Sequence, residues 1–371
     1  MNTSLKKGLG WLLVVLVSSC VDPYRPPEIA APNTYLVVDG FLDSGPGTTT
    51  TIRLSRTQNV SDTKAPTAET RAQVTIESER NETYRLNETT TGVYSITGLS
   101  PQTSQKYRLR IRTSRGSEYL SEYVAVKQTP AIEDIGWRVE NDGIQLFLDT
   151  RDPQNNTRYY RWEFEETWRF TAGYQSFYEI VNREVLPRLV DIFRCWATNR
   201  STNIMLGSSA RLSQDVINDF PLTFIPGTSA KLGIRYSILV RQYALTREAY
   251  EYWDQLAKTT QSLGSLFDPQ PTQVTGNVRS VSNPNEPVLG YFGAGSVATK
   301  RIYINRSDLP FRRTITGYES CVVDTLTLPE LIEQNKFIID INDDGRYFAT
   351  SDGCVDCRLR GTNVKPAFWE D

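Results

Sequence analysis

The stretch "QKYRLRIRTS" at residues 105–114 decides the fold class, because it alternates strictly between two kinds of side chain. The apolar positions are Tyr107, Leu109 and Ile111. The basic positions between them and after them are Arg108, Arg110 and Arg112. Alternation with a period of two predicts a β-strand that has one face in a core and the other in water. We interpret the arginine stripe as the solvated face of this strand rather than as an anion site.

Similar short runs extend on both sides of this stretch, separated by turn residues at intervals of about 8–12 residues. They include "YLVVDGFLD", "TTTIRLSRT" and "AQVTIESE". This spacing is typical of an antiparallel sandwich. We predict a mainly β protein that begins with an immunoglobulin-like β-sandwich over residues 33–130, followed by a linker near Pro130.

The rest of the chain, residues 131–371, is predicted to form a second β-rich domain with a few inserted helices and a cysteine-containing C-terminal tail. Strong alternation in "RYYRWEFEETWRF" predicts a strand with Trp162 and Phe164 in the core. Helices are predicted for "TREAYEYWDQLAKTTQSLG", "LPELIEQN" and "LSQDVINDF". The segment at residues 176–196 is ambiguous between helix and loop.

The N-terminus has the pattern of an export signal. Lys6 and Lys7 precede a short apolar run, and "VSSC" resembles the lipobox of bacterial lipoproteins, in which the cysteine is lipidated. We predict a lipoprotein signal peptide at residues 1–19, lipidation of Cys20, and a Pro-rich tether at residues 20–32. The alternative is an ordinary secretory signal in which Cys20 is incidental.

The composition limits the chemistry. The 371 residues contain no histidine, which excludes Ser-His-Asp triads, Cys-His dyads and most catalytic zinc sites. A net charge of −2 without like-charge runs makes nucleic acid an unsuitable partner. Glu163 and Glu165 share a strand face, while Glu166 falls on the opposite one. We interpret them as ordinary strand residues rather than a hydrolase pair, and predict no enzyme activity and no cofactor.

Two glycine-containing stretches resemble ligand loops only in part. Asp340–Gly345 matches the front of a calcium loop, but Ser351 stands where its bidentate Glu belongs. We favour a plain hairpin there, and leave calcium binding open. The stretch "LGYFGAGSV" is followed by a strand rather than the helix that a phosphate loop needs, so its glycines indicate a bend or close backbone packing.

Besides Cys20, the chain has four cysteines: Cys195, Cys321, Cys354 and Cys357. An even number in an exported protein favours disulfides. A zinc site would need a second close pair, and a thioredoxin-like motif would need a strand–helix context. Four cysteines allow three connectivities, among which we favour bridges from the tail to Cys195 and Cys321.

Exposed aromatic residues would form a binding site, because Trp and Tyr fill pockets and stack on ligands. The candidates are Trp137, Trp168, Tyr174 and Tyr178. Ordinary core or rim positions are the alternative for each of them.

The order of the motifs "CVDPY", "YYRWEFEETW", "RCW", "LVRQYALTREAYEYW", "NPNEPVLGYFGAGSV" and "CVDCRLRGTNVKPAFW" is similar to one family, domain of unknown function 4249. The resemblance implies an outer-membrane lipoprotein of Gram-negative bacteria, on the periplasmic or cell-surface side. It also implies a partnership with a SusC-like TonB-dependent receptor. No catalytic, cofactor or metal residues follow from it, and only Cys20 takes a defined role.

These observations predict a non-enzymatic, membrane-anchored accessory or substrate-binding partner of a TonB-dependent receptor, with a small nutrient or peptide as a ligand. The alternative is a structural or envelope-biogenesis lipoprotein without a small ligand. A hydrolase that uses carboxylates is the third hypothesis.

Overall fold

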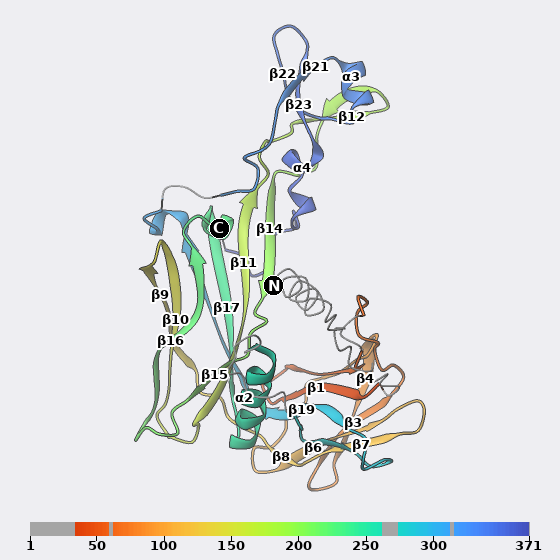
Figure 1. Ribbon diagram of the computed structural model, residues 1–371, viewed down its shortest axis with the longest axis vertical. Helices are drawn as coiled ribbons and strands as arrows, with labels where there is room; N and C mark the ends of the chain where they lie inside the picture. The colour runs from red at the N-terminus through yellow and green to blue at the C-terminus, as the bar shows by residue number, and fades with distance from the viewer. Residues whose placement is uncertain (1–33, 59–61, 262–273, 312–314, 371) are drawn as a thin grey trace, which may run out of the picture. The chain divides into compact units, whose positions relative to one another are not determined.

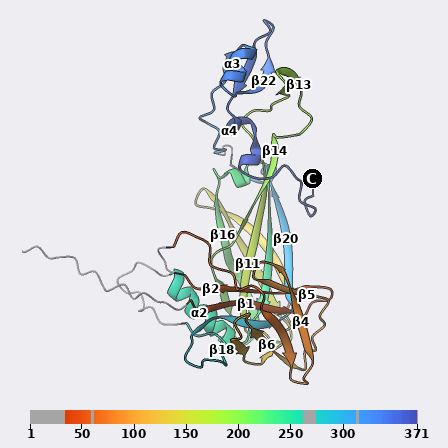
Figure 2. The same cartoon turned by 90° about the vertical axis from the view of Figure 1, so that its right-hand side faces the viewer.

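The computed structural model describes residues 34–58, 62–261, 274–311 and 315–370. The chain from Tyr35 onward forms one compact unit. Strands dominate its regular structure, and helices are few (Figures 1 and 2). Within the described ranges, no helix has both the length and the apolar character needed to cross a membrane. The prediction of a mainly β fold is confirmed.

The first sheet is built largely from the N-terminal strands, in the order β18-β7-β6-β3-β4-β5-β2-β1-β19, with β8 paired to β6. Its strands are β1 (Leu36–Asp43), β2 (Thr49–Arg56), β3 (Gln73–Ser78), β4 (Thr83–Thr90), β5 (Val93–Thr97), β6 (Lys106–Arg112), β7 (Glu118–Ser121), β8 (Val124–Ala125), β18 (Val278–Ser280) and β19 (Val288–Gly295). Because β18 and β19 at its two ends also contact each other, the sheet is nearly closed and sandwich-like.

Strand β6 confirms the opening pattern. Tyr107, Leu109 and Ile111 are at most 1% exposed and belong to the first core. On the other face, Arg108 and Arg110 form ion pairs with Glu77 of the neighbouring strand β3. The arginine stripe is therefore a half-exposed strand face that is neutralised across the sheet.

Two strands of this sheet come from residues 131–371, which the sequence assigned to the second domain. β19 pairs with β1 in parallel, from Leu36 opposite Val288 to Asp43 opposite Gly295, and β18 pairs with β7. The sheet is therefore neither wholly antiparallel nor confined to residues 33–130. A local sequence pattern does not reveal such a long-range parallel pairing, because it carries no information about partners.

A second sandwich follows, made of two facing sheets. One sheet has the order β16-β10-β9, and the other has β14-β11-β17-β20 with β15 paired to β11. The strands are β9 (Ile132–Glu140), β10 (Gly143–Asp152), β11 (Tyr159–Thr171), β14 (Arg194–Arg200), β15 (Met205–Ser208), β16 (Asp215–Pro226), β17 (Arg235–Ala244) and β20 (Val297–Asn305). Buried side chains from both sheets, including Trp162 and Phe164, form one core, as predicted for these two residues.

A third, small group of elements completes the chain. It contains the hairpin β12 (Tyr178–Val181) and β13 (Glu184–Pro187), and a sheet of β21 (Asp324–Leu326), β23 (Tyr347–Thr350) and β22 (Phe337–Ile341). Its helices are α3 (Leu328–Glu333), α4 (Asp352–Val355) and the 3-10 turn η3 (Cys357–Leu359). Figure 1 shows β12, β21, β22, β23 and α3 gathered together.

Two of the three predicted helices are present. Helix α2 (Arg247–Gln261) is capped by the Thr246 hydroxyl, which accepts a hydrogen bond from the Ala249 amide at 3.2 Å. Gly264, the last residue of the stretch for which this helix was predicted, lies outside the described residues. The third predicted helix, "LSQDVINDF", is wrong, because Asp215 begins strand β16. The remaining 3-10 turns are η1 (Ala230–Leu232) and η2 (Arg306–Asp308).

The predicted linker near Pro130 is held by hydrogen bonds rather than free. Lys127 exchanges backbone hydrogen bonds with Ala294 and Ser296, at the point where β19 passes into β20. Two chain segments therefore cross side by side from the first sheet to the second sandwich. This arrangement couples the two sandwiches closely.

Candidate functional site

The most distinctive candidate surface is the group of small elements at residues 174–193 and 315–361, which we call the disulfide-linked module. Cys357 of η3 is bonded to Cys195 of β14, and Cys354 of α4 is bonded to Cys321. This connectivity is one of the two in which the tail is bridged to Cys195 and Cys321, which is the arrangement that the sequence favoured. All four sulfur atoms are used in bridges, which rules out the zinc and CxxC redox-pair readings for this structure.

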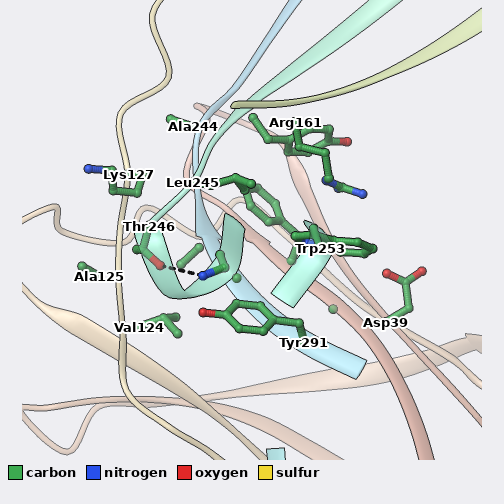
Figure 3. Close-up of a pocket in the computed structure, with 16 residues that line it drawn as sticks. Asp39, Val124, Ala125, Lys127, Arg161, Ala244, Leu245, Thr246, Trp253 and Tyr291 are labelled. Carbon is green, nitrogen blue, oxygen red and sulfur yellow. Dashed lines mark hydrogen bonds between the residues drawn. The ribbon is translucent and has the colours of Figure 1, made fainter. Parts of the chain in front are cut away.

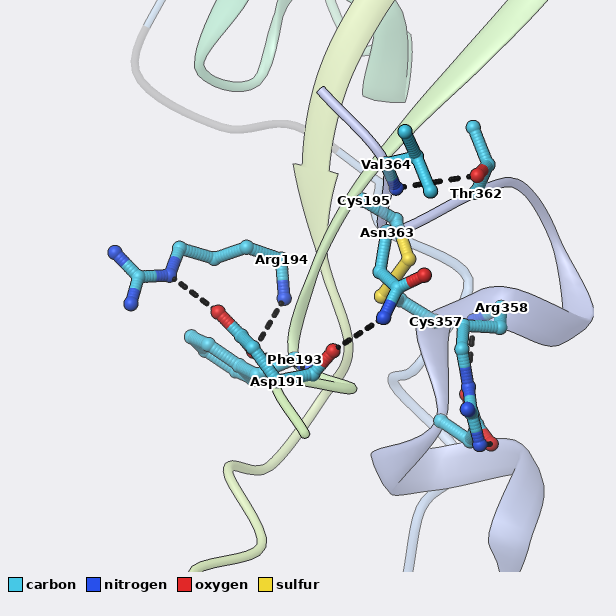
Figure 4. The surroundings of a disulfide bond; sticks show 10 residues. Asp191, Phe193, Arg194, Cys195, Cys357, Arg358, Thr362, Asn363 and Val364 are labelled. Carbon is cyan, nitrogen blue, oxygen red and sulfur yellow. Dashed lines mark hydrogen bonds and ion pairs between the residues drawn. A yellow bond between two sulfur atoms is a disulfide. The ribbon is translucent and has the colours of Figure 1, made fainter. Parts of the chain in front are cut away.

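Polar contacts surround the Cys195–Cys357 bridge (Figure 4). The Asn363 amide donates to the backbone oxygen of Asp191 at 2.8 Å, while Asp191 accepts from the Arg194 guanidinium. Asp356 forms an ion pair with Arg358, and this guanidinium holds the pKa of the Asp356 carboxyl below its ordinary value. Hydrogen bonds therefore reinforce the bridge on both sides.

The module has little core of its own. One cluster contains three buried apolar residues, Leu331, Ile338 and Ala349, and the cluster around the disulfides is similarly small. A small core leaves little apolar burial to offset chain entropy, so cross-links carry much of the stability. The two disulfides therefore explain how this module keeps a defined structure.

Apolar side chains are unusually exposed on this module. Of the eighteen exposed large apolar residues found in the described ranges, eleven belong to it. Leu189 is 92% exposed, and Phe177, Val181, Leu186 and Val190 lie on the same hairpin or its flanks. The sequence pattern of this segment is ambiguous between helix and loop, and it does not identify these residues. The available signal was a run of apolar residues without a consistent period around Pro187.

A pocket of about 290 Å³ lies between the hairpin and strand β22. Its walls include Tyr178 and Phe337, and its inner surface includes the buried Leu331 and Ile338. Tyr178 was one of the four predicted binding aromatics, and it is the one that lines a pocket among those described here. Arg188 at the rim forms an ion pair with Glu179 at 3.3 Å.

The other predicted aromatics do not gather at this place. Trp137 and Trp168 are partly buried against the core of the second sandwich, in agreement with the alternative reading. Tyr174 is half-buried in the module, where its amide donates to the Cys354 oxygen. The four aromatics therefore do not form a single binding site.

A second pocket lies where the two sandwiches meet (Figure 3). Its cavity volume is only about 40 Å³, far below the roughly 300–1,000 Å³ of ordinary small-molecule sites. The Arg161 guanidinium lies 4.3 Å from the ring of Trp253 and 4.5 Å from that of Tyr243, as a cation–π contact on both. This pocket is occupied by the protein's own side chains and acts as a packed joint.

The carboxylates of the hydrolase hypothesis point to different partners. Glu163 pairs with Arg161 and accepts from the Tyr243 hydroxyl, while Glu165 pairs with Arg200. Glu166 lies on the opposite face, as predicted, and is buried with Lys231 at 2.6 Å and the Tyr236 hydroxyl at 2.8 Å. The three side chains are each held by structural contacts.

The partial calcium loop forms the favoured hairpin. Asn342 and Arg346 close it between β22 and β23, with Gly345 at a positive φ of 74°. Within the described ranges, no group of three or more His, Cys, Asp or Glu side chains is placed to hold a metal. The glycines of "LGYFGAGSV" lie in β19, where the chain approaches β1 closely, so the close-packing interpretation is confirmed.

The predicted signal peptide, Cys20 and the Pro-rich tether lie outside the described residues. Their roles remain predictions from the sequence.

The comparisons with known proteins give a family and distant structural likenesses. A two-domain fibronectin type-III segment of chicken tenascin covers 56% of this chain and 92% of its own, at 12% identity and a TM-score of 0.15. So low a TM-score carries no weight for the fold, which rests on the strand pairing above. No curated protein matches the chain. The family described as "Domain of unknown function (DUF4249)" matches residues 21–301, and the chain therefore belongs to this family, as its motifs indicated.

Proposed function

We propose that the protein is a lipid-anchored accessory protein of the outer membrane, which binds a TonB-dependent receptor of the SusC-like class. It is tethered through Cys20 and acts without catalysis, as a partner or substrate-binding component in nutrient uptake. The lipobox pattern, the absence of histidine and the family membership support this proposal.

The observation that carries the proposal is the construction of the disulfide-linked module. Disulfides persist in oxidising compartments outside the cytoplasm. Exposed apolar side chains of the kind found here are a feature of protein interaction sites. A cross-linked module with exposed apolar side chains, on a membrane-anchored chain, suits a protein that binds another protein at the cell envelope.

The test is purification of the protein under its native promoter from gently solubilised outer membranes. We expect a TonB-dependent receptor at a near-equal amount, and an acylated Cys20 in the mass of the N-terminal peptide. The Cys20→Ser variant should lose the acyl groups and appear in the soluble fraction. Recovery of the protein alone, or an unmodified Cys20, would overturn the proposal.

A second function is supported by the pocket around Arg161 and Trp253, whose cavity of about 40 Å³ is too small for a nutrient. In this case the protein is a structural or envelope-biogenesis lipoprotein without a small ligand. A deletion strain separates the two functions. Loss of growth on one nutrient supports the uptake role, whereas general sensitivity to detergents and large antibiotics supports the structural role.

A further inference from the structure

The disulfide-linked module carries a charge that contrasts with the rest of the chain. Its two segments contain twelve acidic and six basic residues, a net charge of −6, whereas the whole chain is at −2. The remainder of the chain is therefore net positive. Among the described residues, four exposed acids of the module make neither an ion pair nor a side-chain hydrogen bond: Glu184, Glu333, Asp343 and Asp344.

The same module carries the exposed apolar side chains and a pocket between them. The pocket volume of about 290 Å³ lies just below the range of small-molecule sites, and suits one large anchoring side chain from a partner. Its two basic rim residues are already neutralised, Arg188 by Glu179 and Lys336 by Asp324 at 3.2 Å. The pocket therefore presents an apolar surface, and neither of its two basic side chains is free to bind an anion.

We propose that this module is the docking surface for a partner protein whose own surface combines apolar and basic side chains. Charge complementarity selects this occupant, because the module is net negative and unpaired acids lie close in sequence to exposed apolar residues, as Glu333 does to Ile332. The same charge argues against an anionic lipid surface, which repels a net negative module. It also argues against a second copy of this chain, because a two-fold contact would bring like charges together.

This inference rests on the proposed partner-binding function, and adds where the contact lies and what chemistry it recognises. An apolar anchor would enter the pocket beside Tyr178 and Phe337. Lysine or arginine residues around the anchor would face the unpaired acids. Such contacts lose strength in salt, since surface charges separated by water are screened over about 8–10 Å at physiological ionic strength.

The experiment is photo-cross-linking of the full-length protein in its own cells. Benzoylphenylalanine replaces Leu189 or Ile332 in the module, or Leu212 or Val281 as matched exposed apolar positions outside it. We expect at least tenfold more adduct from the module positions than from the controls. Mass spectrometry should place the adduct on a protein segment that bears lysine or arginine, and 0.5 M salt should lower the yield several-fold.

A charge reversal provides an independent check. Glu333→Lys with Asp343→Lys should lower the Leu189 adduct at least tenfold, while Glu82→Lys with Glu140→Lys outside the module should change it less than twofold. Circular dichroism verifies that both variants are folded. Adducts to lipid or to a second copy, equal adducts at the control positions, or insensitivity to both salt and charge reversal would overturn the inference.

The outcomes separate this inference from the proposed function. Recovery of a TonB-dependent receptor with adducts only at the control positions would keep the function and remove the docking surface. Module adducts to a basic, apolar surface on an identified protein of another class would keep the docking surface and remove the proposed receptor.

Discussion

Gln242 shows how much a single buried residue can hold in this protein. Its side chain is fully buried, and its amide nitrogen donates to the Pro130 oxygen at 2.8 Å and to the Thr150 hydroxyl at 2.9 Å. Its amide oxygen accepts from the Trp162 indole at 2.8 Å. One side chain therefore supplies hydrogen-bond partners to the linker, to strand β10 and to strand β11.

Replacing this residue should be costly. We expect Gln242→Leu to lower the free energy of unfolding by about 2–4 kcal/mol, because the Pro130 oxygen and the Trp162 indole are left buried without partners. Urea unfolding followed by tryptophan fluorescence measures the change. The exposed Gln128→Ala should stay within about 0.5 kcal/mol. Equal stability of Gln242→Leu and the parent protein would show that the amide contributes nothing.

The ion pairs of Glu77 predict a dependence on pH. Burial raises the pKa of the Glu77 carboxyl, but hydrogen bonds from Arg110 and Arg108 outweigh it and leave the pKa below its ordinary value. A lowered pKa in the folded state stabilises the fold above the unfolded pKa of about 4.3, and this stabilisation disappears as the pH falls through the folded value.

Glu77→Gln should therefore be less stable than the parent at pH 7, by about 1 kcal/mol, since the group is partly exposed. The difference should shrink steadily below about pH 4. Urea unfolding of both proteins between pH 7 and pH 3 measures it. A gap that stays constant with pH would contradict the ion-pair explanation.

The burial of individual residues was predictable where a strand had one solvent-exposed face. The alternation around Leu109 and around Trp162 identified core residues correctly, because burial follows the period of two. Leu189 could not be identified, since an apolar residue on the surface breaks the rule that such a pattern uses. The exposed positions that matter most for the candidate site are therefore those that local patterns miss.

Elements were predictable when their own sequence determined them. Helix α2 has a cap, an acidic first turn and an amphipathic face, and it was predicted within a few residues. The segment "LSQDVINDF" has a good cap residue in Ser213 as well. It nevertheless forms a strand from Asp215, because pairing with β10 along its length outweighs local propensity.

Strand β19 contains a residue whose backbone can be tested. Gly290 has φ of +114° and pairs with Val38 of β1, and an added Cβ would lie 1.8 Å from the Val38 oxygen. We expect Gly290→Ala to lower the free energy of unfolding by more than about 2 kcal/mol, since the strand must move or strain. Chemical denaturation measures the loss.

Gly353→Ala provides the matched control for this position. No heavy atom lies within 4 Å of its added Cβ, so its stability should change by less than about 0.5 kcal/mol. A Gly290→Ala variant as stable as this control would mean that β1 and β19 are not closely paired in solution.

At the scale of the whole molecule, stability should be unequal. The two sandwiches have large cores, whereas the disulfide-linked module has small ones and two cross-links, each worth roughly 2–4 kcal/mol. Reduction with a phosphine should therefore release the module first. Amide hydrogen exchange should increase in β12, β13 and β21–β23, while β6 and β17 stay protected.

The double variant Cys195→Ala with Cys357→Ala should show a smaller increase of exchange, since the Cys321–Cys354 bridge remains. Unchanged exchange in the reduced protein would show that the module is stable without its bridges. A uniform increase over all strands would show that the molecule unfolds as one unit.

The positions of the cysteines along the chain have a consequence for biogenesis. In the proposed export route the polypeptide crosses the inner membrane from its N-terminus. Cys195 therefore emerges well before its partner Cys357, which lies 162 residues further along the chain. Cys321 emerges before its partner Cys354, and the partners of both cysteines then emerge within one Cys-x-x-Cys. An oxidase acting during translocation would join Cys195 to Cys321 first. In that case correct assembly would depend on thiol exchange by an isomerase, and not on oxidation alone.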